Sequence, residues 1–266
     1  MSSELCRWLH QKLESLPLMR FPFDISKLPD NDGTIHFFYE EGENSTHINN
    51  DNGSNDNDSK NSSSIIKAKP RIVRIGISHK EGNFRSTISE YFLLNESKMM
   101  NFTISNAKPS DRSIFRKNIG RALLSKENDY YQKIWEIDFT IRENCNNYGI
   151  MRNIQKEKEI ESTITKILRE KFSFRFIPFD ESQAKKRIGG SAIERSKLIG
   201  IVASCNLCKA SANWLGKYSP ILKIRNGKLW LSEGEGEGEG EGEYLNSPRL
   251  TEKEREEFEN AIVNIK

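Results

Sequence analysis

Hydrophobic residues recur along the chain in two spacings, one typical of helices and one of strands. Apolar positions three and four residues apart predict helices over residues 2–15, 84–94, 114–124, 157–171 and 191–203. Alternating or β-branched runs predict strands over 35–39, 72–77, 131–141 and 172–179. The mixture predicts an α/β (α+β) fold in which helices flank a small antiparallel sheet.

Two short sequence motifs predict the structure of the C-terminal part of the chain. Asn226-Gly227 lies between two apolar runs, a sequence strongly favoured in the turn of a β-hairpin. Thr251-Glu-Lys-Glu254 has the form of a capping box, which predicts that a charged final helix begins there. We therefore expect a C-terminal hairpin followed by a helix.

Two segments are too polar to contribute to a core. Asn44 to Ser64 is almost entirely Asn, Ser and Asp, and Ser232 to Glu243 is a Gly-Glu repeat, so we expect both to be disordered insertions. The first would separate the strands over 35–39 and 72–77. Because the entropy of loop closure grows only logarithmically with length, these strands can still be neighbours in the sheet.

Charge and composition narrow the class of protein. The net charge is +3, and without the two polar segments it rises to about +11. A basic surface suits a phosphate backbone, although many basic domains bind no nucleic acid. No apolar run reaches the ~18 residues that span a bilayer. The four cysteines are too scattered for a disulfide framework. We expect a cytoplasmic protein that meets no membrane.

Three motifs follow one another in a specific order. They are Thr34-Ile-His-Phe-Phe-Tyr39, Arg71-Ile-Val-Arg-Ile-Gly-Ile-Ser-His79 and Ile193-Glu-Arg-Ser-Lys-Leu-Ile-Gly200. Together they resemble the two strand signatures and the acidic helix of the GIY-YIG nuclease superfamily, as a divergent member with Arg-Ile-Gly in place of Tyr-Ile-Gly. The resemblance implies a three-stranded antiparallel sheet flanked by helices and metal-dependent hydrolysis of DNA phosphodiester bonds. DNA is then the expected partner, and the sequence says nothing of the oligomeric state.

The resemblance also divides the chain into expected domains. Residues 1–27 would form an N-terminal helical extension, and residues 28–217 the GIY-YIG-like domain with the Asn-rich insert 44–64 and a further helical insertion. Residues 218–266 would hold the hairpin, the Gly-Glu linker 232–243 and the final helix.

Residue by residue, the strand signatures carry unusual side chains. His36 stands where the first signature has its tyrosine, and it could act as a base near neutral pH or be an ordinary half-buried strand histidine. Arg74 replaces the second tyrosine and suits a phosphate contact, with His79 shortly after it. Arg71 and Arg74 could equally be the solvated edge of the strand.

The helical motifs depart further from the family pattern. The family's helix arginine aligns with Thr87, and Arg85 could replace it only from the entry to that helix. Glu194 matches the acidic position, which implies that it binds one Mg²⁺ or Mn²⁺ ion. Ser191-Ala-Ile-Glu194 is also a capping box, in which the glutamate would only close a helix.

Three functional readings stay open. The first is a GIY-YIG-like endonuclease with His36, Arg74, His79, Arg85 and Glu194 around the phosphate and Glu194 as metal ligand. The second is a catalytically silent nucleic-acid-binding module of the same fold, favoured by Thr87. The third is a structural or protein-interaction domain. Cys205-Asn-Leu-Cys208 has the spacing of half a zinc site, but buried thiols explain it as well.

Overall fold

A computed structural model describes residues 2–30, 33–47, 69–79, 84–179, 195–231 and 250–263. Its strands are β1 (Met19–Arg20), β2 (Gly33–Ser45), β3 (Lys69–Ser78) and β4 (Phe172–Phe179). Its longer helices are α1 (Ser2–Glu14), α2 (Phe84–Phe92), α5 (Ile114–Lys126), α7 (Arg142–Tyr148), α8 (Ile154–Lys171), α10 (Arg195–Ala203), α11 (Leu222–Gly227) and α12 (Glu252–Val263). Short helical turns are η1 (Ile25–Lys27), α3 (Glu96–Met99), α4 (Pro109–Arg112), α6 (Gln132–Trp135), η3 (Gly149–Met151) and η4 (Leu215–Tyr218).

The strands form one antiparallel sheet in the order β1-β4-β2-β3, so β2 is central. The pairing of β2 with β3 across the long Asn-rich segment confirms the expected neighbours. The two-residue strand β1 adds a fourth strand to the three that were expected. His36 lies opposite Gly76 on β3 and Phe176 on β4. This register places the Thr34–Tyr39 and Arg71–His79 motifs side by side.

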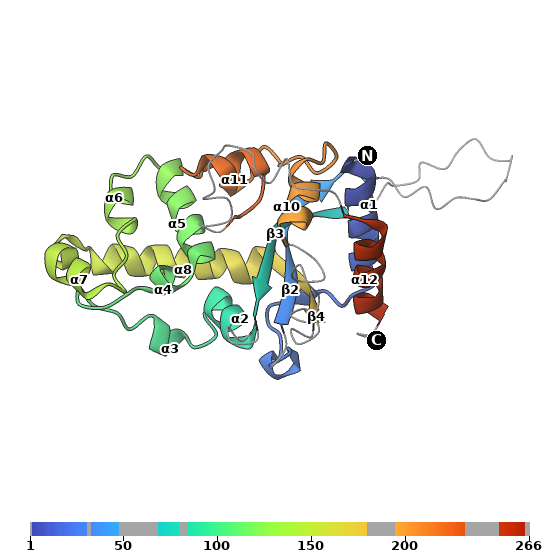
Figure 1. Ribbon diagram of the computed structural model, residues 1–266. Helices are drawn as coiled ribbons and strands as arrows, with labels where there is room; N and C mark the ends of the chain where they lie inside the picture. The colour runs from blue at the N-terminus through green and yellow to red at the C-terminus, as the bar shows by residue number, and fades with distance from the viewer. Residues whose placement is uncertain are drawn as a thin grey trace, which may run out of the picture.

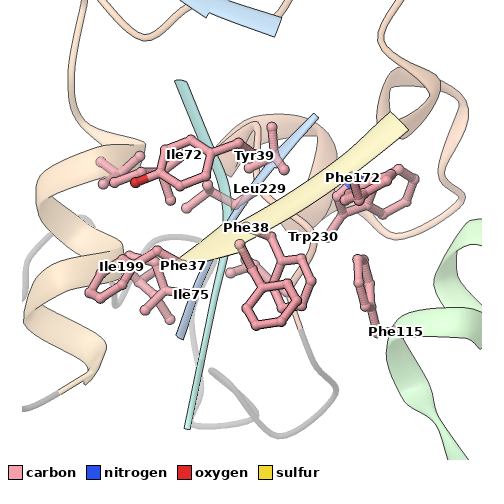
Figure 2. Packing of buried hydrophobic residues seen from close by; sticks show 14 of the residues in the cluster. Phe37, Phe38, Tyr39, Ile72, Ile75, Phe115, Phe172, Ile199, Leu229 and Trp230 are labelled. Carbon is pink, nitrogen blue, oxygen red and sulfur yellow. The ribbon is translucent and has the colours of Figure 1, made fainter. Parts of the chain in front are cut away.

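Both faces of the sheet are covered, because successive residues of β2 point to opposite sides. Phe38 packs against Phe92 of α2 and Phe115 of α5, while its neighbour Phe37 packs against Phe258 of α12. Figure 2 shows the same division, with Phe37 beside Ile199 of α10 and Phe38 on the side of Phe115. In Figure 1, α1 and α12 lie on one side of the sheet, and α2, α5 and α8 on the other.

The segment between α2 and β4 is a helical insertion that extends away from the sheet along α8 (Figure 1). Buried ion pairs hold it together, since the side chains of Arg116 and Glu161, and those of Arg152 and Glu157, are fully buried at 2.7 and 2.6 Å. A buried charge is tolerated only with a close partner. The sequence predicted the two long helices of this insertion, with α8 beginning three residues earlier than expected.

Several local predictions are confirmed. β4 covers the expected residues 172–179. The capping box at the start of α12 is present, because the backbone N–H of Glu254 donates to Thr251 Oγ1 at 3.2 Å and that of Thr251 donates to the Glu254 carboxylate at 2.7 Å. No helix in the described ranges is long and apolar enough to cross a membrane.

Other local predictions are wrong. The strand expected over 131–141 is replaced by α6 and turns, because Trp135 inserts beside Gly120 and donates from its indole to the backbone oxygen of Lys117. The hairpin at Asn226-Gly227 is also wrong. These residues end α11, and the left-handed turn follows at Lys228 with φ of 56°. Asn-Gly therefore ends a helix here instead of forming a hairpin turn. Asn and Gly are common at helix C-termini as well as in hairpin turns.

The predicted disordered insertion begins too early in the chain, at Asn44. Asn44 and Ser45 belong to β2, and His47 is buried. Residues 48–64 of that segment and the Gly-Glu repeat lie outside the described residues.

Candidate active site

His36 lies in an aromatic pocket on β2. It is fully buried, and its ring centre is 5.4 Å from that of Phe84, 5.6 Å from Phe38 and 6.3 Å from Tyr91. A side chain at Gly76 would place its Cβ 2.0 Å from His36 Nε2. The glycine of the second motif therefore makes room for the histidine of the first.

This environment fixes the charge of His36. Burial lowers its pKa well below 6.5, and the nearby charges of Arg74 and Arg195 lower it further. The imidazole is therefore neutral at neutral pH. Within the described parts of the chain, neither ring nitrogen has a hydrogen-bond partner. A neutral imidazole can still accept a proton, but a low pKa makes it a weak base.

Arg74 lies on the same face of the sheet and is also buried. Its guanidinium donates to the backbone oxygen of Trp230 at 2.8 Å and to the hydroxyl of Tyr91 at 3.2 Å, and lies 4.6 Å from the centre of the Phe115 ring. Arg71 is fully buried as well and pairs with Glu43 at 2.8 Å. The alternative of a solvated strand edge is therefore wrong for both arginines.

The first turn of α2 carries Arg85 and Thr87. Arg85 donates to the backbone oxygens of Leu28 and Ser26 and pairs with Asp30 at 2.9 Å, which fastens α2 to the segment before β2. Thr87, at the position of the family's arginine, lies 3.3 Å from the hydroxyl of Ser78 at the end of β3. The entry to α2 thus meets the end of β3.

The remaining predicted site residues are His79 and Glu194. His79 follows β3 directly and is exposed. Glu194 lies outside the described residues, and the described α10 begins at the next residue, Arg195. The structure brings His36 and Arg74 together, with Tyr91 between them. Sequence reasoning missed Tyr91, whose only signal was its place on the buried face of a predicted helix.

The predicted binding of a divalent cation depends on Glu194. The described ring contacts of His36 come from Phe38, Phe84 and Tyr91, and aromatic rings are not ligands for Mg²⁺ or Mn²⁺, which prefer oxygen. Binding of such an ion therefore stays a prediction that rests on the Glu194 carboxylate.

A second group of reactive side chains lies beyond the other end of β2. Cys6 and His10 of α1, His47 after β2 and Cys208 after α10 are all buried, and their donor atoms lie within 4.8 Å of one another. Burial lowers the pKa of His10 to about 3, so its imidazole is neutral. The Cys205-x-x-Cys208 spacing was the one sequence signal for this cluster.

Comparison with known proteins identifies the family. No curated protein and no solved structure matches the chain. The family model of the GIY-YIG domain matches residues 55–244, which include β3, α2, β4 and α10. The match covers most of the chain, and the sheet agrees with the expected fold of this family. The protein therefore belongs to the GIY-YIG domain family.

Proposed function

We propose that the protein is an endonuclease that hydrolyses DNA phosphodiester bonds at the end of the sheet where His36 lies. The observation that carries the proposal is the buried imidazole of His36, which has no partner among the described residues and lies near the cationic side chains of Arg74 and Arg195. Buried polar groups without partners are rare in folded proteins, and a catalytic role is one of the explanations for such a group.

Cations around this imidazole suit a phosphodiester. Hydrolysis develops negative charge on the phosphate oxygens, and guanidinium groups fixed in advance stabilise that charge. Arg195 begins α10, which packs against β3, and Arg85 lies at the entry to α2, whose Thr87 contacts Ser78 at the end of β3. Mg²⁺ or Mn²⁺ held by Glu194 would act as a Lewis acid on the phosphate.

A second candidate function is a nucleic-acid-binding module without cleavage. Thr87 favours it, because a threonine supplies no positive charge where the family has an arginine. The contacts of Arg85 favour it too, since its guanidinium is engaged by Leu28, Ser26 and Asp30. Such a module would keep the basic surface and the salt-dependent affinity for DNA.

Cleavage of supercoiled plasmid DNA separates the two functions. The purified full-length protein should nick the plasmid in Mg²⁺ or Mn²⁺ and lose this activity in EDTA. Glu194→Gln should reduce the rate at least about 100-fold, because it removes the metal ligand without changing the size of the side chain. Glu143→Gln is the matched control, because Glu143 is an exposed residue of α7, far from β2 in Figure 1.

The outcomes distinguish the proposals. Equal cleavage by wild type and Glu194→Gln would reject Glu194 as the site of chemistry. No cleavage, together with DNA binding that weakens steeply with salt and does not respond to metal, would support the binding module. Absence of both cleavage and binding at low salt would reject both.

A further inference from the structure

Two cysteines and two histidines from three separate segments meet in the core. Cys6 and His10 are four residues apart on α1 and therefore lie on one face of that helix. His47 follows β2, and Cys208 follows α10. All four side chains are at most 4% exposed. Figure 1 shows α1 and α10 close to each other at the end of the sheet where these segments meet.

The distances between donor atoms match those of a tetrahedral zinc site. Cys208 Sγ lies 3.6 Å from Cys6 Sγ, 3.4 Å from His10 Nε2 and 3.3 Å from His47 Nε2. Zinc bonds of about 2.3 Å to sulfur and about 2.0 Å to nitrogen predict tetrahedral edges of about 3.8 Å between sulfurs and about 3.5 Å between sulfur and nitrogen. The three distances from Cys208 Sγ are within about 0.2 Å of these edges, and all four donor atoms lie within 4.8 Å of one another.

Hydrogen bonding alone accounts poorly for this cluster. The cysteines are free, and Cys208 has three donor or acceptor atoms within 3.6 Å. A thiol has one hydrogen, so Cys208 can donate to one of these atoms and must accept from the other two through a sulfur that is a weak acceptor. A metal ion bound by thiolate would satisfy the three contacts together.

We propose that Cys6, His10, His47 and Cys208 bind one structural Zn²⁺ ion. Two sulfur and two imidazole donors in tetrahedral arrangement select zinc over the hard cations Mg²⁺ and Mn²⁺. Four protein ligands, all buried, leave no open position for a substrate, which is the mark of a structural site. This site is therefore distinct from the one proposed at Glu194 and does not depend on the nuclease proposal.

The position of this site indicates what the ion does. His47 comes at the far end of β2 from His36, so the ion lies away from the candidate active site. It would tie α1 to the central strand and to the C-terminal end of α10. Because α10 begins at Arg195, the ion would fix the helix that follows Glu194 directly in the sequence.

Cys205 is the close alternative to one of the four ligands. Its Sγ lies 3.6 Å from His47 Nε2 and 4.0 Å from the hydroxyl of Ser3, and its thiol also hydrogen-bonds with those of Cys6 and Cys208. It does not belong to the four donors that all lie within 4.8 Å of one another. We assign it as a buried thiol beside the site, which makes it a sharp control.

Metal content of the purified full-length protein tests the site. We expect one equivalent of zinc per chain by elemental analysis after dialysis against metal-free buffer. Cys208→Ser and Cys6→Ser should each retain less than about a tenth of that amount, since each removes a ligand. Cys205→Ser and Cys145→Ser should keep the full equivalent.

A measurement on the wild-type protein covers the case in which the ligand variants fail to fold. Protein whose zinc has been exchanged for Co²⁺ should show the visible absorption of tetrahedral cobalt and the charge-transfer band of cobalt bound to thiolate. A folded wild-type protein that takes up neither zinc nor cobalt would overturn the proposal. Full zinc content in Cys208→Ser would overturn it too, and loss of zinc in Cys205→Ser with retention in His10→Ala would overturn the ligand assignment.

Discussion

His36, near the start of β2, and His47, just after its end, are both buried, but their surroundings differ. His36 packs among aromatic rings, and its nitrogens have no partner in the described ranges, whereas His47 Nε2 lies within 3.6 Å of two cysteine sulfurs. The first environment comes from neighbouring strands and one helix. The second joins α1, β2 and the end of α10. One end of the strand thus holds a closed aromatic pocket, and the other a group of buried thiol and imidazole donors.

The largest expected effect comes from the cysteine and histidine end. Removal of zinc by a strong chelator, or Cys208→Ser, should lower the free energy of unfolding by about 4 kcal/mol or more, because a structural ion binds the folded state only. Cys145→Ser should change it by less than about 0.5 kcal/mol, since Cys145 lies on α7 outside the cluster. Chemical denaturation measures both. If the chelator-treated protein is as stable as the untreated one, no ion stabilises the cysteine and histidine end of β2.

Glu40 lies on β2 between His36 and His47, and its contribution to the free energy of unfolding should depend on pH. The indoles of Trp214 and Trp230 donate to its carboxylate at 3.2 and 3.3 Å, and burial raises its pKa from 4.5 to about 7. The folded state therefore holds this proton more tightly than the unfolded state. The stabilising contribution of protonated Glu40 is fully present below pH ~4.5 and is lost as the pH rises through ~7. The free energy of unfolding should change by about 3 kcal/mol over this range.

Glu40→Gln tests this dependence. The variant should be less sensitive to pH than the wild type between pH 4.5 and 8, because glutamine does not titrate. Denaturation curves at several pH values measure the difference between the two proteins. Parallel pH profiles would show that Glu40 does not titrate in this range.

At the His36 end of β2, stability should depend on the close approach of β3 at Gly76. Gly76→Ala should lower the free energy of unfolding by about 2 kcal/mol, because the added Cβ would lie 2.0 Å from His36 Nε2. The same substitution in a His36→Ala background should cost less than about 1 kcal/mol, since the obstructing ring is absent. Equal costs in both backgrounds would contradict this account of the Gly76 position.

The smallest effect is expected at the first turn of α12. Thr251→Ala should lower the free energy of unfolding by about 1 kcal/mol, because it removes the side-chain oxygen that accepts from the N–H of Glu254. Thr251→Ser keeps that oxygen and should behave like the wild type. Thermal melts of the two variants measure the cap, and equal melting temperatures would show that the cap contributes nothing.

Sequence patterns predicted the parts of the fold that depend on near neighbours. The aromatic strand over 172–179 and the capping box at Thr251 are set by residues within one element, and both are confirmed. The expected strand over 131–141 and the hairpin at Asn226 failed because tertiary contacts decide those segments. Trp135 fills the space beside Gly120, and Arg71 donates to the backbone oxygen of Lys228 just after α11.

The candidate sites differ in the same way. The motifs named His36 and Arg74 as members of one expected site, and the register of β2 and β3 places both on one face of the sheet. The cysteine and histidine cluster could not be assembled from spacing, since Cys6 and Cys208 are separated by 202 positions and His47 stands in a segment of disordered composition. The sequence motif Cys205-x-x-Cys208 suggested half a metal site, but nothing in the sequence indicated Cys6, His10 or His47 as the other ligands.

Cleavage by zinc-loaded Glu194→Gln protein tests most directly the claim that the two ends of β2 have separate roles. We predict a folded protein that contains one equivalent of zinc and does not nick plasmid DNA in Mg²⁺ or Mn²⁺, beside a wild-type protein that does. Nicking by the zinc-loaded variant at the wild-type rate would contradict the account.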